Sequence, residues 1–229
     1  MKSLKSLALC SFSLSDKKYH TTAVSKLIIE VKDACSYSRL SIIFYFVKTI
    51  ASVIARQNSK RLVYKNLLPY KGEPLVLRAV KKLLHSKLFD QVILSTDSEL
   101  IAYTCMNLSG LYILRRPPDL CEDNIASVPV FQHILENFPA EIHLNYNCNF
   151  PECHESVFAR GIELATKYGE SLSVPYAVWT QTKECLKNYG DPFKITAETY
   201  EDERIGSIDI HTMEDLINVH RSNVSSDPW

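Results

Sequence analysis

The chain has 229 residues, with 26 lysine and arginine residues against 26 aspartate and glutamate residues, so its formal net charge is zero. This balance gives no general attraction to nucleic acid or anionic lipid, and a phosphate site would have to be a local cluster of basic groups. Hydrophobic residues make up 46% and charged residues 23%, which is typical of a globular protein with one core.

Seven cysteines are present, an odd number without a C-x-x-C pair, so the sequence indicates neither a disulfide framework nor a zinc knuckle. We therefore expect a reducing, cytoplasmic environment. The longest apolar run, at residues 42–47, is too short to span a bilayer, and no membrane association is expected.

Residues 1–46 show no regular periodicity beyond a possible short helix at residues 25–34. From Val47 onward, short apolar runs alternate with amphipathic stretches. Strands are predicted at residues 50–55, 91–97, 111–114, 141–145 and 171–179, and helices at residues 74–88, 98–106, 126–137, 152–167 and from Thr212 onward. Asp97 or Ser98 is expected to cap one helix, and Thr212 with Asp215 resembles a capping box at the last.

Alternating strands and helices predict an α/β fold with three layers, an open and mostly parallel sheet of Rossmann-like type. Right-handed crossovers place the carboxyl ends of the strands at one edge, where ligands bind. Arg56, Asp97 and Asn147 each follow a predicted strand, so we expect them to converge there.

One loop concentrates basic side chains directly after the first predicted strand of this region. Arg56, Lys60, Arg61 and Lys65 could wrap a polyphosphate, with backbone N–H groups completing the cradle. The G-x-x-x-x-G-K-[ST] spacing of a P-loop is absent. On charge alone, a solvated basic loop is the more probable interpretation.

The same loop resembles the signature A-R-x-x-S-K-x-L-x-x-K-N of CMP-sialic acid synthetases (acylneuraminate cytidylyltransferases). Every fixed position is matched, by Ala55, Arg56, Ser59, Lys60, Leu62, Lys65 and Asn66. Three further segments resemble family motifs in the same order: residues 88–97, which end in S-T-D, residues 116–127, and the S-I-D-I-H-T of residues 207–212. The resemblance covers residues 48–221.

The resemblance implies a nucleotidyltransferase fold of the nucleotide-diphospho-sugar transferase type. It also implies an enzyme that joins CMP from CTP to a nonulosonic (sialic-type) sugar acid with release of pyrophosphate, for surface polysaccharide or glycan biosynthesis. Arg56 and Lys65 would be the catalytic groups on the triphosphate. The nucleotide-binding set would be Arg56, Ser59, Lys60, Lys65, Asn66, Ser95 and Asn147. Asp97 and Asp209 would hold Mg²⁺, which prefers oxygen ligands.

The sequence departs from the family pattern in several places. His211 stands where the family has a second late aspartate, and imidazole is a poor Mg²⁺ ligand. Asn147 takes the place of a glutamine, and a local turn built on its side chain is an equally good interpretation. In the family, the region before the last motif carries sugar contacts and a dimerisation arm, and here it is shortened to residues 168–204. The residues that select the sugar are therefore not identified. The resemblance implies that a homodimer is possible.

Family members begin near Val47, so we expect a cytidylyltransferase-like domain at residues 47–229. Residues 1–46 would be an extension that is disordered or not natively translated. Two alternatives stay open beside a sialic-type acceptor: a 3-deoxy-octulosonate or other sugar nucleotidyltransferase, and a non-catalytic nucleotide-binding member of the family. A nucleic-acid partner is disfavoured by the neutral charge balance.

Overall fold

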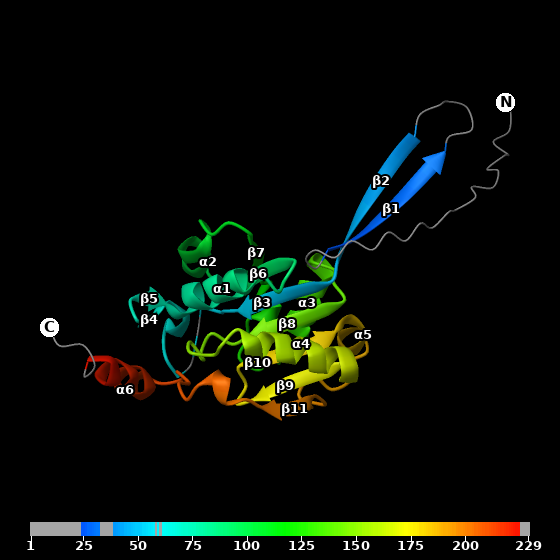
Figure 1. Cartoon of the computed structure of the whole chain (residues 1–229). Helices are drawn as coiled ribbons and strands as arrows, with labels where there is room; N and C mark the ends of the chain where they lie inside the picture. Colours follow the sequence, from blue (N-terminus) through cyan, green and yellow to red (C-terminus); the bar gives the residue numbers. More distant parts are fainter. Residues whose placement is uncertain (1–23, 33–38, 58, 60, 225–229) are drawn as a thin grey trace. The chain divides into compact units, whose positions relative to one another are not determined.

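The computed structural model describes residues 24–32, 39–57, 59 and 61–224. The chain divides into two compact units, residues 1–46 and 47–229. In the N-terminal part, β1 (Val24–Lys32) pairs with β2 (Arg39–Val47) in a two-stranded sheet (Figure 1). The helix expected at residues 25–34 is therefore wrong for residues 25–32. That residues 1–46 lie outside the working enzyme stays a prediction.

The second unit is built on a seven-stranded sheet. Its order is β11 (Glu198–Glu201), β9 (Glu170–Val174), β10 (Val178–Thr182), β8 (Ile142–Tyr146), β3 (Thr49–Ile54), β6 (Gln91–Thr96) and β7 (Leu111–Arg115). Strand β3 is parallel to both β6 and β8, β6 is parallel to β7, and β11 is parallel to β9. Only β10 runs antiparallel to both of its neighbours within this sheet. The predicted open, mostly parallel sheet is confirmed.

The helices of this unit are α1 (Leu75–Ser86), α2 (Glu99–Cys105), α3 (Ser127–Asn137), α4 (Ser156–Tyr168), α5 (Lys183–Lys187) and α6 (Met213–Val224). Three short 3₁₀ turns accompany them: η1 (Lys65–Leu67), η2 (Pro118–Leu120) and η3 (Glu203–Ile205). A small two-stranded sheet of β4 (Pro69–Tyr70) and β5 (Glu73–Pro74) precedes α1.

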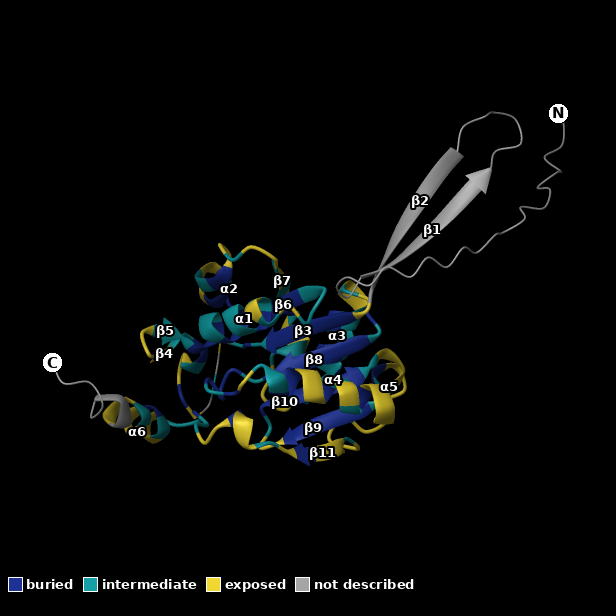
Figure 2. Ribbon diagram, viewed as in Figure 1, coloured by how far each residue is buried: buried dark blue, intermediate teal, exposed yellow. Residues whose placement is uncertain are grey.

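Helices cover both faces of the sheet, which gives the three predicted layers. On one face, Val53 and Leu94 of the sheet pack with Val80 of α1 and Phe158 of α4 in the largest apolar cluster. On the other face, residues of β3 and β6 pack against α3 in a second cluster. The inner strands β3, β6, β8, β9 and β10 are largely buried between these layers (Figure 2). Continuous buried runs such as β3 and β6 are typical of strands covered on both faces, which is why the sequence predicts three layers.

Two predicted elements differ from the structure. The helix expected at residues 152–167 begins at Ser156, because residues 150–155 form turns in which Cys153 N donates to Phe150 O and Val157 N donates to His154 O. The strand expected at residues 171–179 is a hairpin of β9 and β10. Pro175 separates the two strands, and its missing N–H does not support a continuous ladder.

The C-terminal segment packs against the loop that follows β3. Leu62 of the loop and Leu75 at the start of α1 share an apolar cluster with Ile210 and Leu216. This packing brings residues far apart in sequence to the carboxyl edge of the sheet. The order of the strands also reverses at β3, which lies between β8 and β6, and ligands bind at such a switch point in open α/β sheets.

Helix α6 starts at the predicted capping box. The Thr212 hydroxyl accepts from Asp215 N at 3.2 Å, and the Asp215 carboxylate accepts from Thr212 N at 2.7 Å and from His211 N at 2.9 Å. Backbone bonds to its carboxylate lower the pKa of Asp215. The cap fixes the turn that presents Asp209 and His211.

Candidate active site

The basic loop leaves β3 and is clamped at both ends by one buried amide. Asn66 Nδ2 donates to the Arg56 carbonyl oxygen at 2.9 Å, and Asn66 Oδ1 accepts from the Cys148 thiol at 3.2 Å. Asn66 thereby closes the loop on itself and ties it to the segment after β8. Tyr64, just before η1, has φ of 55°, a left-handed conformation that helps turn the chain back. These two contacts hold the loop in shape, and the nucleotide-binding role of Asn66 stays a prediction.

Arg56 lies half-buried at the start of this loop. Its guanidinium forms an ion pair with Asp123 at 2.6 Å and lies 3.4 Å from the Cys121 carbonyl oxygen. Both partners come from the segment after β7 that resembled a family motif. The ion pair with Asp123 fixes the orientation of the Arg56 guanidinium, which can form paired hydrogen bonds with a more highly charged anion such as a phosphate.

Lys65 lies on the inner side of the loop. Burial lowers the pKa of its ammonium, while the nearby Cys148 and Asp209 raise it and the Arg61 and Arg56 charges lower it. Arg61, Arg56 and the Asp209 carboxylate are thus near enough to Lys65 to act on its pKa. That these cations form a polyphosphate site stays a prediction.

Asp209 and His211 face the loop from the C-terminal segment. His211 Nε2 lies 2.7 Å from Asp209 Oδ1, and Arg61 Nη2 lies 2.9 Å from His211 Nδ1. A guanidinium can only donate, so Nδ1 accepts from Arg61, and in the neutral ring Nε2 carries the proton. Burial raises the pKa of Asp209 and lowers that of His211. The imidazole that replaces the family's carboxylate thus links Arg61 to Asp209.

Asp97 follows β6 and contacts the backbone at the start of the basic loop. Its Oδ1 accepts from Gln57 N at 2.8 Å, one residue beyond Arg56. Ser98, not Asp97, caps α2, because the Ser98 hydroxyl accepts from Ile101 N. Of the two caps that the sequence allowed, the structure selects Ser98, and the Asp97 carboxylate stays at the edge of the site.

Ser95 and Asn147 both form hydrogen bonds with neighbouring residues of the protein. Ser95 accepts from buried Arg116 through both its hydroxyl, at 3.3 Å, and its carbonyl oxygen, at 2.9 Å. Asn147 donates to the Tyr176 carbonyl oxygen and accepts from Asn149 N at 3.2 Å, the Asx turn that was the alternative interpretation. Ser59 is half-buried in the loop, and Lys60 lies outside the described residues.

Asn149 is a site residue that sequence patterns did not single out. It is 3% exposed, its Nδ2 lies 3.3 Å from His211 Nδ1, and its Oδ1 has no hydrogen-bond partner among the described residues. A buried amide oxygen without a partner is costly, so it can accept a bond from a ligand. The only signal in the sequence is its position, two residues after Asn147 behind a predicted strand.

The two carboxylates proposed for magnesium belong to different hydrogen-bond sets. Asp97 contacts the backbone of Gln57, whereas Asp209 contacts His211. Within the described part of the chain, no three histidine, cysteine, aspartate or glutamate side chains form a group able to hold a metal ion.

Known relatives are similar to part of the chain. It is 31% identical over 90 residues to the pseudaminic acid cytidylyltransferase of Campylobacter jejuni, a match that covers 39% of each chain. It is also 31% identical over 94 residues to the N-acylneuraminate cytidylyltransferase of Streptococcus agalactiae, covering 40% of this chain and 22% of the relative. The alignments thus span well under half of these curated relatives.

Solved structures share the fold over a longer stretch. The CMP:2-keto-3-deoxy-manno-octonic acid synthetase in complex with CTP superposes with a TM-score of 0.63 at 14% identity, covering 79% of this chain and 100% of that one. A cytidylyltransferase from Leptospira borgpetersenii gives 0.58 at 16% identity, covering 80% and 99%. At these identities the likeness establishes the fold. The model of the family described as cytidylyltransferase matches residues 50–200, more than half of the 229 residues, and the protein therefore belongs to the cytidylyltransferase family.

Proposed function

We propose that this protein transfers CMP from CTP to a sugar acid of the nonulosonic, sialic-acid type and releases pyrophosphate, as a step toward surface polysaccharide or glycan. The observation that carries the proposal is the loop after β3, which holds Arg56, Arg61 and Lys65 around one region of the sheet edge. Relatives named as cytidylyltransferases for N-acylneuraminate and pseudaminic acid support this choice of substrates.

The reaction needs no covalent bond to the protein. An oxygen of the sugar hydroxyl attacks the α-phosphorus of CTP, the bond from that phosphorus to the bridging oxygen breaks, pyrophosphate leaves, and the hydroxyl proton passes to water. Positioning and charge stabilisation are sufficient for such a transfer. Arg56 and Lys65 bind the triphosphate and stabilise the charge that develops on the departing pyrophosphate.

Binding requires Arg56 to exchange partners. In the structure its guanidinium is paired with Asp123 at 2.6 Å. A triphosphate carries several charges and offers pairs of oxygens to a guanidinium, so it competes well with a single half-exposed carboxylate. Asn66 and Ser59 keep the loop in shape during this exchange, and the unpartnered Asn149 oxygen can accept a bond from the nucleotide.

Magnesium is part of the proposal. Mg²⁺ is usually held by one or two carboxylates together with substrate phosphates, so two carboxylates on either side of the basic loop suit it without a larger protein cluster. Asp97 and Asp209 would hold the ion, which would supply neutralising charge at the phosphate oxygens. The His211 contact with Asp209 competes with this role.

The cellular setting belongs to the same proposal. The described cysteines, at positions 105, 121, 148, 153 and 185, are free thiols, which supports a reducing cytoplasm. No helix in the described part of the chain has the length and apolar character needed to cross a membrane.

Release of pyrophosphate tests the proposal directly. The full chain is incubated with CTP and Mg²⁺ and a panel of acceptors: N-acylneuraminate, pseudaminic acid and 2-keto-3-deoxy-manno-octonic acid. We expect release with one of the first two. Release only with the third would move the protein to the alternative sugar class, and activity with UTP in place of CTP would contradict the proposed nucleotide.

A second function is favoured by a specific observation. Both Arg56 and Asp209 already have partners, Asp123 and His211, which would suit a non-catalytic member that binds nucleotide without turnover. Such a protein would bind CTP and release no pyrophosphate with any acceptor. The proposed enzyme would do both.

A further inference from the structure

The turn segment between β8 and α4, residues 147–155, is fixed at Glu152 by contacts with two other elements. Lys82 Nζ of α1 donates to the backbone carbonyl oxygens on either side of Glu152, at 2.8 Å to Pro151 and 2.5 Å to Cys153. The Glu152 side chain reaches the hairpin of β4 and β5, where its Oε1 accepts from the Tyr70 hydroxyl at 2.5 Å. The backbone of the turn segment is thus bound to α1, and its one carboxylate to the hairpin.

Two cations share the Glu152 carboxylate with Tyr70. Lys71 Nζ lies 3.1 Å and Arg78 Nη2 lies 3.9 Å from Glu152 Oε1, and both cations lie over the Tyr70 ring. Burial raises the pKa of Glu152, but the bonds from Tyr70 and Lys71 and the Arg78 charge outweigh burial, so this pKa lies below its usual value. Glu152 is therefore an ionised acceptor for the hydroxyl of Tyr70, which is itself fully buried.

The segment that leads to α6, residues 204–211, runs along the same turn segment. Two backbone bonds join them, from Ile210 N to Asn149 O at 3.0 Å and from His154 N to Arg204 O at 2.8 Å. Between these bonds, Gly206 lies against Glu152, because a Cβ at Gly206 would come within 3.2 Å of Glu152 Cβ. The placement of Asp209 therefore depends on where the turn segment at Glu152 lies.

The Tyr70 ring extends this contact to the basic loop. It packs with Leu62 of the loop and Ile210 of the late segment in one apolar cluster. Tyr70 also follows η1, the turn that contains Lys65. Three segments that form the candidate site therefore meet at the bond between Tyr70 and Glu152: the basic loop, the turn segment after β8 and the segment before α6.

We propose that Glu152 and Tyr70 are positioning residues for the transfer of CMP, an inference that rests on the proposed function. They act through the three segments that they join, which carry Lys65, Asn149 and Asp209. Alignment of a triphosphate with an attacking hydroxyl is sensitive to distance, and a misplacement of about 1 Å can cost about 10²-fold in rate. The Tyr70–Glu152 bond keeps the three segments in register.

Steady-state kinetics of the full chain is the first test. Glu152→Met has about the length of glutamate and no acceptor, and we expect kcat for pyrophosphate release to fall about 10–10²-fold. KM for CTP should stay within about twofold, since an effect on alignment lowers kcat and kcat/KM together. Glu152→Gln keeps an acceptor for Tyr70 and loses only half-exposed ion pairs, so it should stay within about threefold of the wild type.

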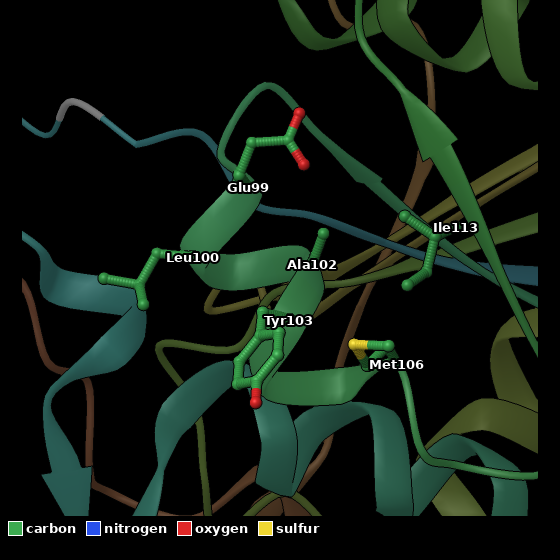
Figure 3. Close-up of a pocket in the computed structure, with 6 residues that line it drawn as sticks. All are labelled: Glu99, Leu100, Ala102, Tyr103, Met106 and Ile113. Atoms are coloured by element: carbon green, nitrogen blue, oxygen red, sulfur yellow. The ribbon is translucent and has the colours of Figure 1, made fainter.

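Tyr70→Phe is a second variant that leaves the packing of the ring in place. It removes the hydroxyl alone, and kcat should fall about tenfold, because Glu152 keeps its two cations and the displacement is smaller. Tyr103→Phe and Glu99→Met are the matched controls. Both residues line a hollow of about 450 Å³ beside α2, and neither is a candidate site residue (Figure 3). Both controls should keep the wild-type kcat.

A further control separates positioning from loss of stability. Gly161→Ala crowds the contact between α4 and β10, away from the Tyr70–Glu152 bond. It should unfold at a lower urea concentration than the wild type and keep the wild-type kcat. A fall in kcat for Glu152→Met at equal stability is then an effect of position.

Amide hydrogen exchange tests the positioning without any turnover, which separates this inference from the proposed function. Glu152→Met should speed exchange at two amides that close the loop and the late segment, those of Leu68, bonded to Lys65 O, and Ile210, bonded to Asn149 O. Glu152→Gln should keep the wild-type rates at both. The amides of β3 should exchange equally in all three proteins.

Three results would overturn the proposal: a wild-type kcat in Glu152→Met, a Glu152→Gln variant as slow as Glu152→Met, or wild-type exchange at Leu68 and Ile210 in Glu152→Met. Faster exchange in Glu152→Met together with a wild type that releases no pyrophosphate would refute the proposed function. The contact that holds the three segments in register would stand in that case.

Discussion

Lys65 is a half-buried cation of the loop. Burial lowers the pKa of its ammonium, with further contributions from the two neighbouring guanidiniums. A partly desolvated cation next to Arg56 and Arg61 is unfavourable without an anion, so the site is electrostatically prepared for one.

Replacing Lys65 should therefore stop turnover while leaving the fold intact. For Lys65→Ala we expect pyrophosphate release to fall by about 10²–10³-fold, the effect of removing one charge-stabilising donor. Lys183→Ala is the matched control, since Lys183 is half-exposed and paired with Glu141 away from the loop. Normal turnover of the Lys65 variant would refute its assigned role.

His211 is the residue at which this chain departs most clearly from its family pattern. It accepts from Arg61, and its Nε2 lies 2.7 Å from Asp209 Oδ1, an oxygen of a carboxylate that we assign to magnesium. His211→Asp should bring a second hard oxygen ligand and free Asp209 from the imidazole.

We expect His211→Asp to lower the Mg²⁺ concentration for half-maximal CTP binding by about tenfold, equivalent to about 1.4 kcal/mol. Titration of CTP binding with Mg²⁺ measures this. His154→Asp, at an exposed histidine bonded to Ser156, is the control and should change nothing. An unchanged magnesium requirement in His211→Asp would exclude Asp209 from the metal site.

Single residues show where sequence reasoning ends. Only the motif match indicated Asp209. Arg61 of the loop contacts His211, 150 positions further along the chain, and Leu62 packs with Ile210 beside them. No local sequence pattern predicts such contacts. Arg56 and Lys65 were identified by type and position. The role of Asn149 depends on tertiary contact with His211, which is not encoded in any short motif.

Helix α4 shows how an element is held against the sheet. Gly161 lies where α4 meets β10, and a Cβ there would come within 2.9 Å of Thr180 Oγ1 and 3.0 Å of the Tyr200 hydroxyl. The glycine permits a close approach of helix and strand that alanine would prevent.

Gly161→Ala should therefore lower the free energy of unfolding by about 1–3 kcal/mol, the usual cost of overpacking a core. Urea unfolding at neutral pH measures the change. The comparison is Gly190→Ala, where an added Cβ meets nothing within 4 Å, and we expect no loss there. Equal stability of the two variants would show that the α4–β10 contact can expand.

Helices and strands with a clear apolar pattern could be predicted from the sequence, whereas short or exposed strands could not. The strands at residues 50–55 and 91–97 match β3 and β6 within one residue at each end, because both are continuous buried runs. The sequence predicted one strand where the structure has the β9–β10 hairpin, because Pro175 is the only proline or glycine between the two strands. Strand β11 is short and mostly exposed, so its sequence lacks an apolar pattern.

At the scale of the whole molecule, the sheet buries a histidine that links stability to pH. His143 in β8 is fully buried, with Nε2 2.8 Å from the Ser52 hydroxyl and Nδ1 3.4 Å from Gln181 Oε1. Burial lowers the pKa of His143 to about 4. The folded protein therefore holds this imidazole neutral where an unfolded chain would bind a proton.

Between pH 6.5 and 4 the unfolded chain binds more protons at His143 than the folded one, so the free energy of unfolding falls as pH falls through this window. We expect His143 to account for a loss of about 3 kcal/mol between these values. Urea unfolding at several pH values should show a shallower slope for His143→Asn than for the wild type. His154→Gln should keep the wild-type slope, and equal slopes in all three proteins would contradict the assignment.

Calorimetric titration of the full chain with CTP, against ATP, GTP and UTP, in the presence and absence of Mg²⁺, tests the central claim most directly. The account predicts binding that is selective for CTP and strengthened by magnesium, because we propose a nucleotide site formed by the loop at Arg56–Asn66 with the carboxylates Asp97 and Asp209. A folded sample that binds none of the four nucleotides would contradict it, and the basic loop would then be a solvated remnant of the family's site.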